Sequence, residues 1–251
     1  MTLLEAVAVF VAGIAAGTIN TIVGSGTLVT FPTLLAVGYP PVLANVSNTV
    51  GLVPGSLSGA VGYRHELRGQ GSRLIRLGVA SLLGGVAGAL LLLSLPATAF
   101  DAIVPVLIGL GCVLVVVQPW VSRRVRPRAA SPSHGSVLVW FLVFLAGVYG
   151  GYFGAAQGVL LIAILGLGLS ESLQRINAAK NILALLVNAV AAVVFIAVAD
   201  VSWAAAGLVA AGSVIGGQLG ATVGRRLPAP VLRGFVAIVG VVAIVMLVFF
   251  D

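Results

Sequence analysis

The chain has 251 residues, of which 60% are hydrophobic and only 8% are charged. A soluble domain of this length needs far more polar surface, so the composition excludes that class and predicts an all-α, polytopic helical membrane protein. The formal net charge of +7 is spread over several short segments rather than along one face, which argues against nucleic-acid binding.

Apolar segments that could cross a bilayer, which takes about 20 residues as helix, recur along the whole chain. They are 3–23, 42–63, 74–94, 99–120, 137–157, 176–199, 201–223 and 229–250. Two shorter segments, 27–38 and 158–170, follow glycine-rich breaks and would reach only ~18 Å as helices. They could complete a crossing only with extended residues on either side, and such backbone must face protein or water.

The basic residues indicate how these segments are oriented. The arginines cluster at 64–76, 123–128 and 225–233, and short cytoplasmic loops collect such residues. All Lys and Arg fall on the cytoplasmic side only if the two short segments also cross, with both termini outside. We therefore predict a first transmembrane repeat at 1–121, a cytoplasmic linker at 122–136 and a second repeat at 137–251. Each repeat has about five helical segments. Because a chain that crosses the bilayer an odd number of times ends on the side opposite to its start, the second repeat is inverted relative to the first. Broken or short helices are then expected near the midplane.

Polar side chains occur inside two of the apolar segments with the same spacing. Asn45, Asn48, Thr49 and Ser56 recur 132 positions later as Asn177, Lys180, Asn181 and Asn188. Spacings of three, four and eleven lie on one face of a helix. A buried amide or ammonium is costly in lipid unless it meets a partner or a wet cavity, so the two stripes predict a shared substrate site.

Glycine-rich breaks precede both short segments, again 132 positions apart. They are Gly24, Ser25 and Gly26 in the first half and Ala156, Gln157 and Gly158 in the second. Ser25 or Thr27 is expected to cap the short helix that follows. Free N–H groups at such a helix start carry about half a positive charge and attract anions. Lys180, the only lysine, adds a full positive charge, so the sequence favours an anionic substrate.

Each of these features has a structural alternative. The glycines could only allow close helix packing, and the asparagines could only bridge helices, at ~0.6–2 kcal/mol each. Lys180 could extend to the cytoplasmic headgroups, although its place on the polar stripe favours the interior. No catalytic triad, carboxylate pair, phosphate loop or metal-ligand spacing occurs, so we expect neither an enzyme nor a cofactor or metal.

The residues resemble a known family along essentially the whole chain. The first half contains GTINTIVGSGTLVTFPTLLAVGYPPVLANVSNT, and the second contains the weaker echo GGYFGAAQGVLLIAILGLG followed by INAAKN. These motifs are similar to the TauE/SafE family of sulfite exporters. The resemblance implies export of sulfite, organosulfonates or related small anions across the plasma membrane of a prokaryote. The second half lacks a counterpart of Pro32 and has Lys180 in place of Asn48, which leaves the cargo open.

The resemblance also implies a set of substrate-binding residues. They are Asn20, Gly24, Gly26, Asn45, Asn48, Thr49, Gln157, Gly158, Asn177 and Lys180. Ser25, as a candidate cap, and Asn181, as a member of the polar stripe, complete the set.

The expected mechanism is alternating access, in which one half rocks against the other around a midplane site. Two other functions stay open: a channel-like anion pore, and a non-transporting membrane subunit whose polar stripes serve assembly. The expected partners are a small anion and the lipid bilayer, with no nucleic acid. The oligomeric state stays open, and a homodimer is one alternative.

Overall fold

The computed structural model describes residues 1–124, 136–222, 234 and 238–242, and helices are the only regular elements among them. The all-α prediction is therefore confirmed. The first half contains α1 (Leu3–Ile22), α2 (Thr27–Ala36), α3 (Pro41–Gly62), α4 (Gly71–Ser94) and α5 (Ala97–Arg124). The second contains α6 (Val137–Tyr152), α7 (Gln157–Gly168), α8 (Leu173–Val198) and α9 (Trp203–Thr222).

Five of the described helices are long and apolar enough to cross a bilayer unaided: α1, α4, α5, α8 and α9, the fifth over Ala97–Trp120. This is fewer than the sequence predicts. The segment 42–63 forms α3, but its polar residues lower its hydropathy. The segment 137–157 is interrupted, because α6 ends at Tyr152 and the break follows. The segment 229–250 lies mostly outside the described residues, as does most of the predicted linker at 122–136.

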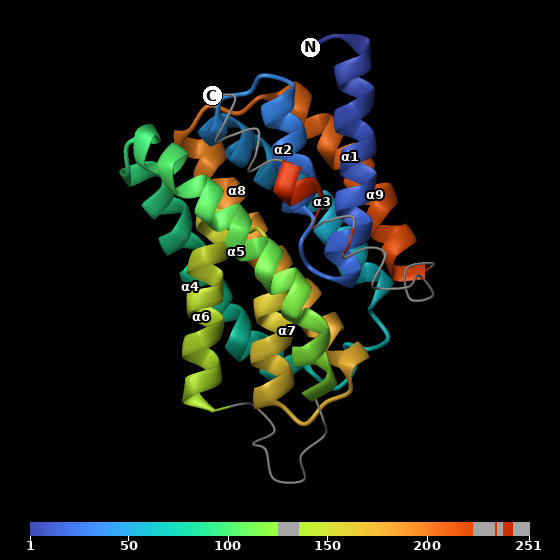
Figure 1. Cartoon of the computed structure of the whole chain (residues 1–251). Coiled ribbons are helices and arrows are strands. Elements are labelled where there is room, and N and C mark those ends of the chain that lie inside the picture. The colour runs from blue at the N-terminus through green and yellow to red at the C-terminus, as the bar shows by residue number, and fades with distance from the viewer. Residues whose placement is uncertain (125–135, 223–233, 235–237, 243–251) are drawn as a thin grey trace.

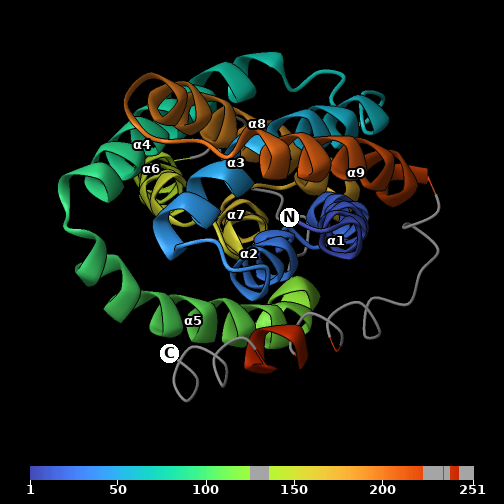
Figure 2. The same cartoon turned by 90° about the horizontal axis from the view of Figure 1, so that it is seen from above.

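The two short helices turn back inside the bundle. In Figure 1, α1 descends from the N-terminal end and α2 returns to that end, whereas α6 rises from the opposite end and α7 returns there. Seen from above, α2 and α7 are enclosed by the longer helices (Figure 2). Most residues of the two connecting breaks are buried. The non-helical backbone therefore faces protein, as a membrane interior requires.

The two halves are interlocked through their first helices. α1 packs on α9 and α6 packs on α4. Both contacts depend on glycine, because a Cβ on Gly216 would overlap the Ile14 carbonyl oxygen and one on Gly88 would overlap that of Val148. Such close approach is typical of membrane helices. These matched contacts support an inverted repeat, which stays a prediction.

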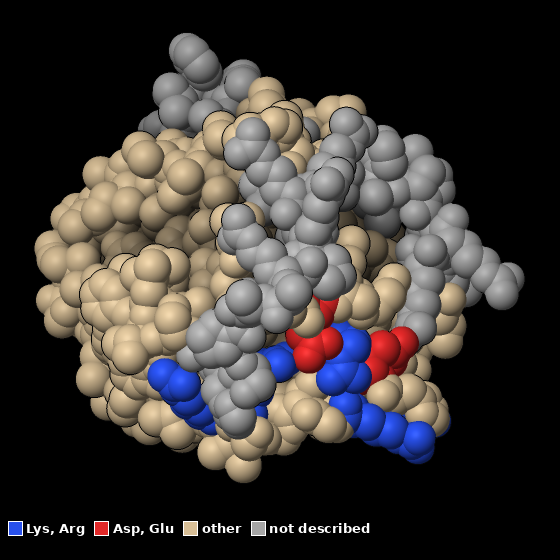
Figure 3. All heavy atoms as spheres, turned by 90° about the horizontal axis from the view of Figure 1, so that it is seen from below, with Lys and Arg blue, Asp and Glu red and all other residues tan. Residues whose placement is uncertain are grey.

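The described arginine side chains gather at one end of the bundle. These side chains belong to the α3–α4 connection, to the first two turns of α4 and to the first turn of α8; they are Arg64, Arg68, Arg73, Arg76 and Arg175. Figure 3 shows this face from below, with Asp and Glu beside the basic residues. We call it the arginine face. The N-terminus and the α2–α3 connection lie at the other end (Figure 1). Tyr39 belongs to this connection, and we call this end the tyrosine face.

Candidate functional site: two helix breaks in contact

Both breaks contain a residue in the left-handed backbone conformation. Gly24 has φ of +90° just after the end of α1, and Gly154 has φ of +77° just after the end of α6. Ala156, at the N-cap of α7, is also left-handed, with φ of +59°. This conformation ends a helix and lets the chain change direction. It suits glycine but strains alanine, at about 1–2 kcal/mol. The two helix ends thus share their backbone geometry at Gly24 and Gly154, which are not the pair that the offset of 132 matches, and the strain at Ala156 belongs to the second break alone.

The two breaks touch each other. The Gly158 N–H donates to the Gly24 carbonyl oxygen at 3.0 Å. A Cβ on either glycine would overlap the Cα of the other, so only glycine fits at this crossing. Gly24 and Gly158 therefore do allow close packing, as the structural alternative for the glycines states. The contact also means that the Gly158 N–H is already used in this conformation, and is not free as the sequence suggests.

The polar stripes of α3 and α8 run past these breaks and contact the helix ends. Asn45 Nδ2 donates to the Tyr152 carbonyl at 3.0 Å, and Asn177 Nδ2 donates to the Thr21 carbonyl at 3.1 Å. Each asparagine therefore caps the broken helix of the opposite half. The stripes also meet directly, because Asn188 Nδ2 donates to Ser56 Oγ at 3.2 Å.

Lys180 lies fully inside the protein, with 0% of its surface exposed. Its Nζ donates to the carbonyls of Asn20 at 2.8 Å and Thr21 at 3.1 Å, at the C-terminal end of α1. Asn181 Nδ2 also reaches the Thr21 carbonyl, at 3.4 Å. The headgroup alternative for Lys180 is therefore wrong. The ammonium instead lies against the carbonyls of the α1 terminus, where a positive charge is favourable.

The predicted cap of α2 is absent. Gly26 occupies the N-cap position and the helix start has no side-chain cap. Thr27 is the first helical residue, and its Oγ1 accepts a hydrogen bond from Asn48 Nδ2 at 3.4 Å. Thr30 Oγ1 donates to Asn48 Oδ1, so Asn48 joins α3 to α2. The cap prediction failed because α3 supplies the amide that Thr27 bonds, which local spacing does not reveal.

The remaining predicted residues line the same region. Thr49 is buried and its Oγ1 donates to the Asn45 carbonyl at 2.9 Å. A Cβ on Gly26 would overlap the Ala16 carbonyl, which brings the start of α2 against α1. Gln157 is the first residue of α7 and its side chain packs against Gly150. The structure thus brings the predicted residues of both halves to one place.

Several buried polar groups at the breaks have no hydrogen-bond partner within the described part of the chain. They are Ser25 Oγ, Asn45 Oδ1, Gln157 Nε2 and Asn177 Oδ1. The backbone N–H groups of Ser25, Gly26 and Thr27 also donate to no described group. Buried polar groups are normally satisfied, so unpaired ones concentrated at one place call for a ligand or water. Among the described residues, no three His, Cys, Asp or Glu side chains gather to hold a metal ion.

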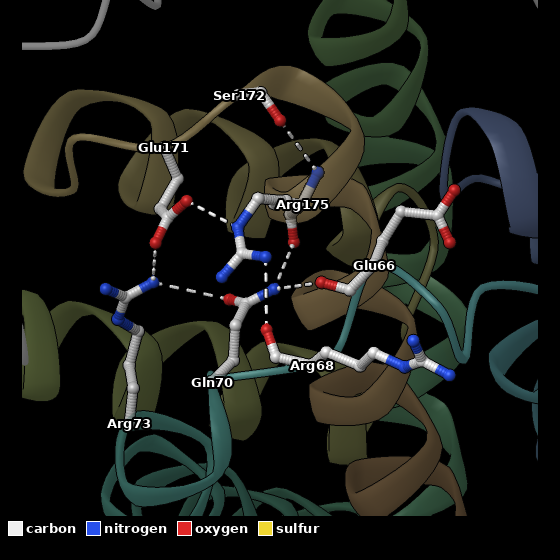
Figure 4. Close-up of polar contacts among 7 residues, drawn as sticks. All are labelled: Glu66, Arg68, Gln70, Arg73, Glu171, Ser172 and Arg175. Carbon is white, nitrogen blue, oxygen red and sulfur yellow. Dashed lines mark hydrogen bonds and ion pairs between the residues drawn. The ribbon is translucent and has the colours of Figure 1, made fainter.

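One cluster at the arginine face was missed by sequence reasoning. Glu171 accepts from Arg73 at 2.9 Å and from Arg175 at 2.6 Å (Figure 4). The spacing of Glu171 and Arg175, four residues apart, is a signal that could have paired them. Arg73 lies 98 positions from Glu171, and no local pattern joins them.

The chain is similar to known proteins over most of its length. Residues 9–247 match the family model described as sulfite exporter TauE/SafE. The probable membrane transporter protein of Haemophilus influenzae is 25% identical over 228 residues, covering 89% of this chain and 88% of that protein. The probable membrane transporter protein YfcA of Escherichia coli strain K12 is 26% identical over 241 residues, covering 93% and 86%. A probable membrane transporter protein of Sinorhizobium, ORF9, is 26% identical over 236 residues, covering 92% and 88%.

Proposed function

Because the chain belongs to the sulfite exporter TauE/SafE family, we propose that this membrane transporter exports small anions such as sulfite or organosulfonates by alternating access. The observation that carries the proposal is the contact between the two helix breaks, where Gly158 N–H meets Gly24 O at 3.0 Å among unpaired buried polar groups. Paired interruptions of this kind are where secondary transporters bind their cargo.

The electrostatics of the breaks favour an anion. Each break brings the C-terminal end of one helix, about −0.5 charge, close to the N-terminal end of the next, about +0.5. These partial charges nearly cancel. Lys180 adds a full positive charge on the α1 side, and no acidic residue accompanies it on the stripes. The unpaired N–H groups of Ser25, Gly26 and Thr27 then offer donors to the anion.

Alternating access is supported by the way the short helices turn back. α2 lies between the breaks and the tyrosine face, and α7 lies between the breaks and the arginine face (Figure 1). Movement of one half against the other would therefore expose the breaks to one side at a time. Export of a monoanion from a cell that is negative inside gains ~2.3 kcal/mol per 100 mV. No coupling ion is required on energetic grounds.

Counterflow in proteoliposomes tests the proposal. Vesicles loaded with unlabelled sulfite should take up labelled sulfite with saturable kinetics, and sulfonates, thiosulfate and small carboxylates added outside would rank the cargo by competition. A channel-like pore would instead give flux that does not saturate and shows no counterflow. A non-transporting subunit would give no flux, and changes at Asn45 or Asn177 would then alter its assembly.

A further inference from the structure

A polar network joins the two halves at the arginine face. Glu171 lies in the connection after α7, and its carboxylate binds Arg73 of α4 and Arg175 of α8 (Figure 4). Gln70 lies beneath them with 2% exposure. Its Oε1 accepts from Arg73 at 3.3 Å, and its Nε2 donates to the Arg175 carbonyl at 3.2 Å. We call Gln70, Arg73, Glu171 and Arg175 the arginine-face tether.

A second polar contact joins the halves at the tyrosine face. Ser202, in the connection between α8 and α9, donates its Oγ proton to the Tyr39 hydroxyl at 3.0 Å. Its N–H donates to Ser47 Oγ of α3 at 2.9 Å. Tyr39 lies in the connection after α2. We call Tyr39, Ser47 and Ser202 the tyrosine-face tether.

The two tethers occupy corresponding places in the two halves. Tyr39 and Glu171 are 132 positions apart, and each lies three residues beyond the end of its short helix. Ser202 and Gln70 are also 132 positions apart. Each short helix is therefore held at its outer end to the opposite half, by charged groups at one face and neutral groups at the other.

We propose that these tethers are opposing gates, each of which closes the path between the helix breaks and one face of the membrane. The proposal rests on the transport function above. A short helix moves as a rod, so α7, whose first residues touch Gly24, cannot move away from the break while Glu171 is held by Arg73. The same holds for α2, which is anchored through Tyr39.

The composition of the arginine-face tether suits a gate. The side chains of Arg73, Glu171 and Arg175 are 12%, 18% and 32% exposed, so water competes for their contacts. Partly exposed ion pairs are weak enough to break and re-form. Two guanidinium groups on one carboxylate leave a net positive charge, which raises the local concentration of anions at this face.

The labelling rate of a cysteine placed at the break reports whether each gate is open, and it does not require transport. The reporter is Ser25→Cys in a Cys112→Ala background, labelled by an impermeant, positively charged methanethiosulfonate added to either face of oriented vesicles. Glu171→Gln should raise the labelling rate from the arginine face about fivefold, the bias that a pair of this strength gives, and lower it from the other face. Tyr39→Phe should have the reverse effect. Arg68→Gln is the control, because only the carbonyl of Arg68 joins the network (Figure 4).

The double variant Arg73→Glu with Glu171→Arg should bring the arginine-face labelling rate below that of Glu171→Gln without reaching the parent rate, since it re-forms one pair of opposite charges but brings a second guanidinium against Arg175. Labelling of Glu171→Gln and Tyr39→Phe that equals Arg68→Gln, or rises equally from both faces, would overturn the gates. A parent protein that shows no counterflow would overturn the transport function instead. The two failures are therefore distinguishable.

Discussion

Ser25 and Lys180 are both buried beside the helix breaks, but they differ in how much of their hydrogen-bonding capacity is already used. Lys180 donates to two backbone carbonyls, whereas Ser25 Oγ has no described partner. Removing a used donor leaves a buried acceptor unpaired, while removing an unused hydroxyl costs no contact. Substitution of Ser25 should therefore affect substrate binding alone, whereas substitution of Lys180 should also lower stability.

Ser25→Ala should leave the melting temperature unchanged and weaken the apparent affinity for the anion about tenfold, because a hydrogen bond to a charged ligand contributes about 1.5–3 kcal/mol. Counterflow at varied sulfite concentration measures this. Ser81→Ala is a matched control, since Ser81 Oγ is also buried and unpaired but belongs to α4, where its backbone packs near Gly147. Equal affinities in the two variants would remove Ser25 from the site.

Lys180→Met should lower the free energy of unfolding by about 1–3 kcal/mol and abolish efflux, because the Asn20 carbonyl loses its donor inside the protein. Thermal unfolding in detergent and counterflow are the two measurements. Asn181→Ala should be milder, since the Thr21 carbonyl keeps Lys180 and Asn177. A Lys180→Met protein as stable as the parent would show that capping α1 is unimportant.

At the level of elements, the breaks hold the short helices in place through backbone contact. The break between α1 and α2 contacts the start of α7 where Gly24 meets Gly158. Any side chain there forces the two breaks apart. Because the Gly24–Gly158 hydrogen bond belongs to the same contact, separation would also free the Gly158 N–H. Transport would therefore have to separate the backbone of Gly24 from that of Gly158.

Gly24→Ala should be much more destabilising than Gly38→Ala. Both glycines have positive φ, +90° and +93°, so both variants carry a similar backbone strain of about 1–2 kcal/mol. Only Gly24 has backbone in the way, since nothing lies within 4 Å of a Cβ on Gly38. Unfolding of the two variants in parallel isolates the steric part. Equal losses would mean that the crossing can relax.

The connections at the arginine face predict an acid dependence. Burial raises the pKa of Glu171, but the hydrogen bonds and charges of Arg73 and Arg175 outweigh it and hold the pKa below its ordinary value of 4.5. A lowered pKa stabilises the fold above the unfolded value, and this stabilisation is lost as the pH falls through the folded pKa. The parent should therefore exceed Glu171→Gln in stability, by at most about 1 kcal/mol, at neutral pH.

Melting curves across the acid range measure this difference, which should disappear below the folded pKa of Glu171. Glu66 lies in the same cluster (Figure 4), so the comparison is repeated with Glu66→Gln in both proteins. A difference that persists unchanged into strong acid would contradict the role of the Glu171 charge.

For the whole molecule, the distribution of charge determines the orientation in the membrane. The described arginine side chains occupy one end of the bundle, and Glu5, Asp101 and Asp200 belong to segments at the other end. Lys and Arg favour the cytoplasmic side. The arginine face should therefore lie in the cytoplasm, with the N-terminus outside.

Single cysteines in a Cys112→Ala background test this orientation. His65→Cys, in the exposed α3–α4 connection, should react only from the cytoplasm, and Thr98→Cys, at the exposed start of α5, only from outside. Impermeant thiol labelling of intact cells and of inverted vesicles gives the comparison. The reverse pattern would contradict the predicted topology.

Much of the fold and site could be predicted because membrane chains satisfy their backbone locally. Apolar segments, glycine breaks and polar spacing are all local, so the helices and the convergence of Asn45, Asn177 and Lys180 near the breaks followed from sequence. The cap of α2 and the end of α6 did not. Thr27 bonds Asn48 of α3, and the break after Tyr152 depends on left-handed residues that include an alanine.

The sequence by itself determined the class, the helical segments, the polar stripes and the family, because each is written in residue types at fixed spacing. Only the tertiary structure decided which distant groups pair with each other and which polar groups stay unpaired. Lys180 meets the α1 carbonyls, Gly24 meets Gly158, and Arg73 reaches Glu171 across 98 positions. Such contacts join residues far apart in the chain, and their geometry exists only once the two halves pack together.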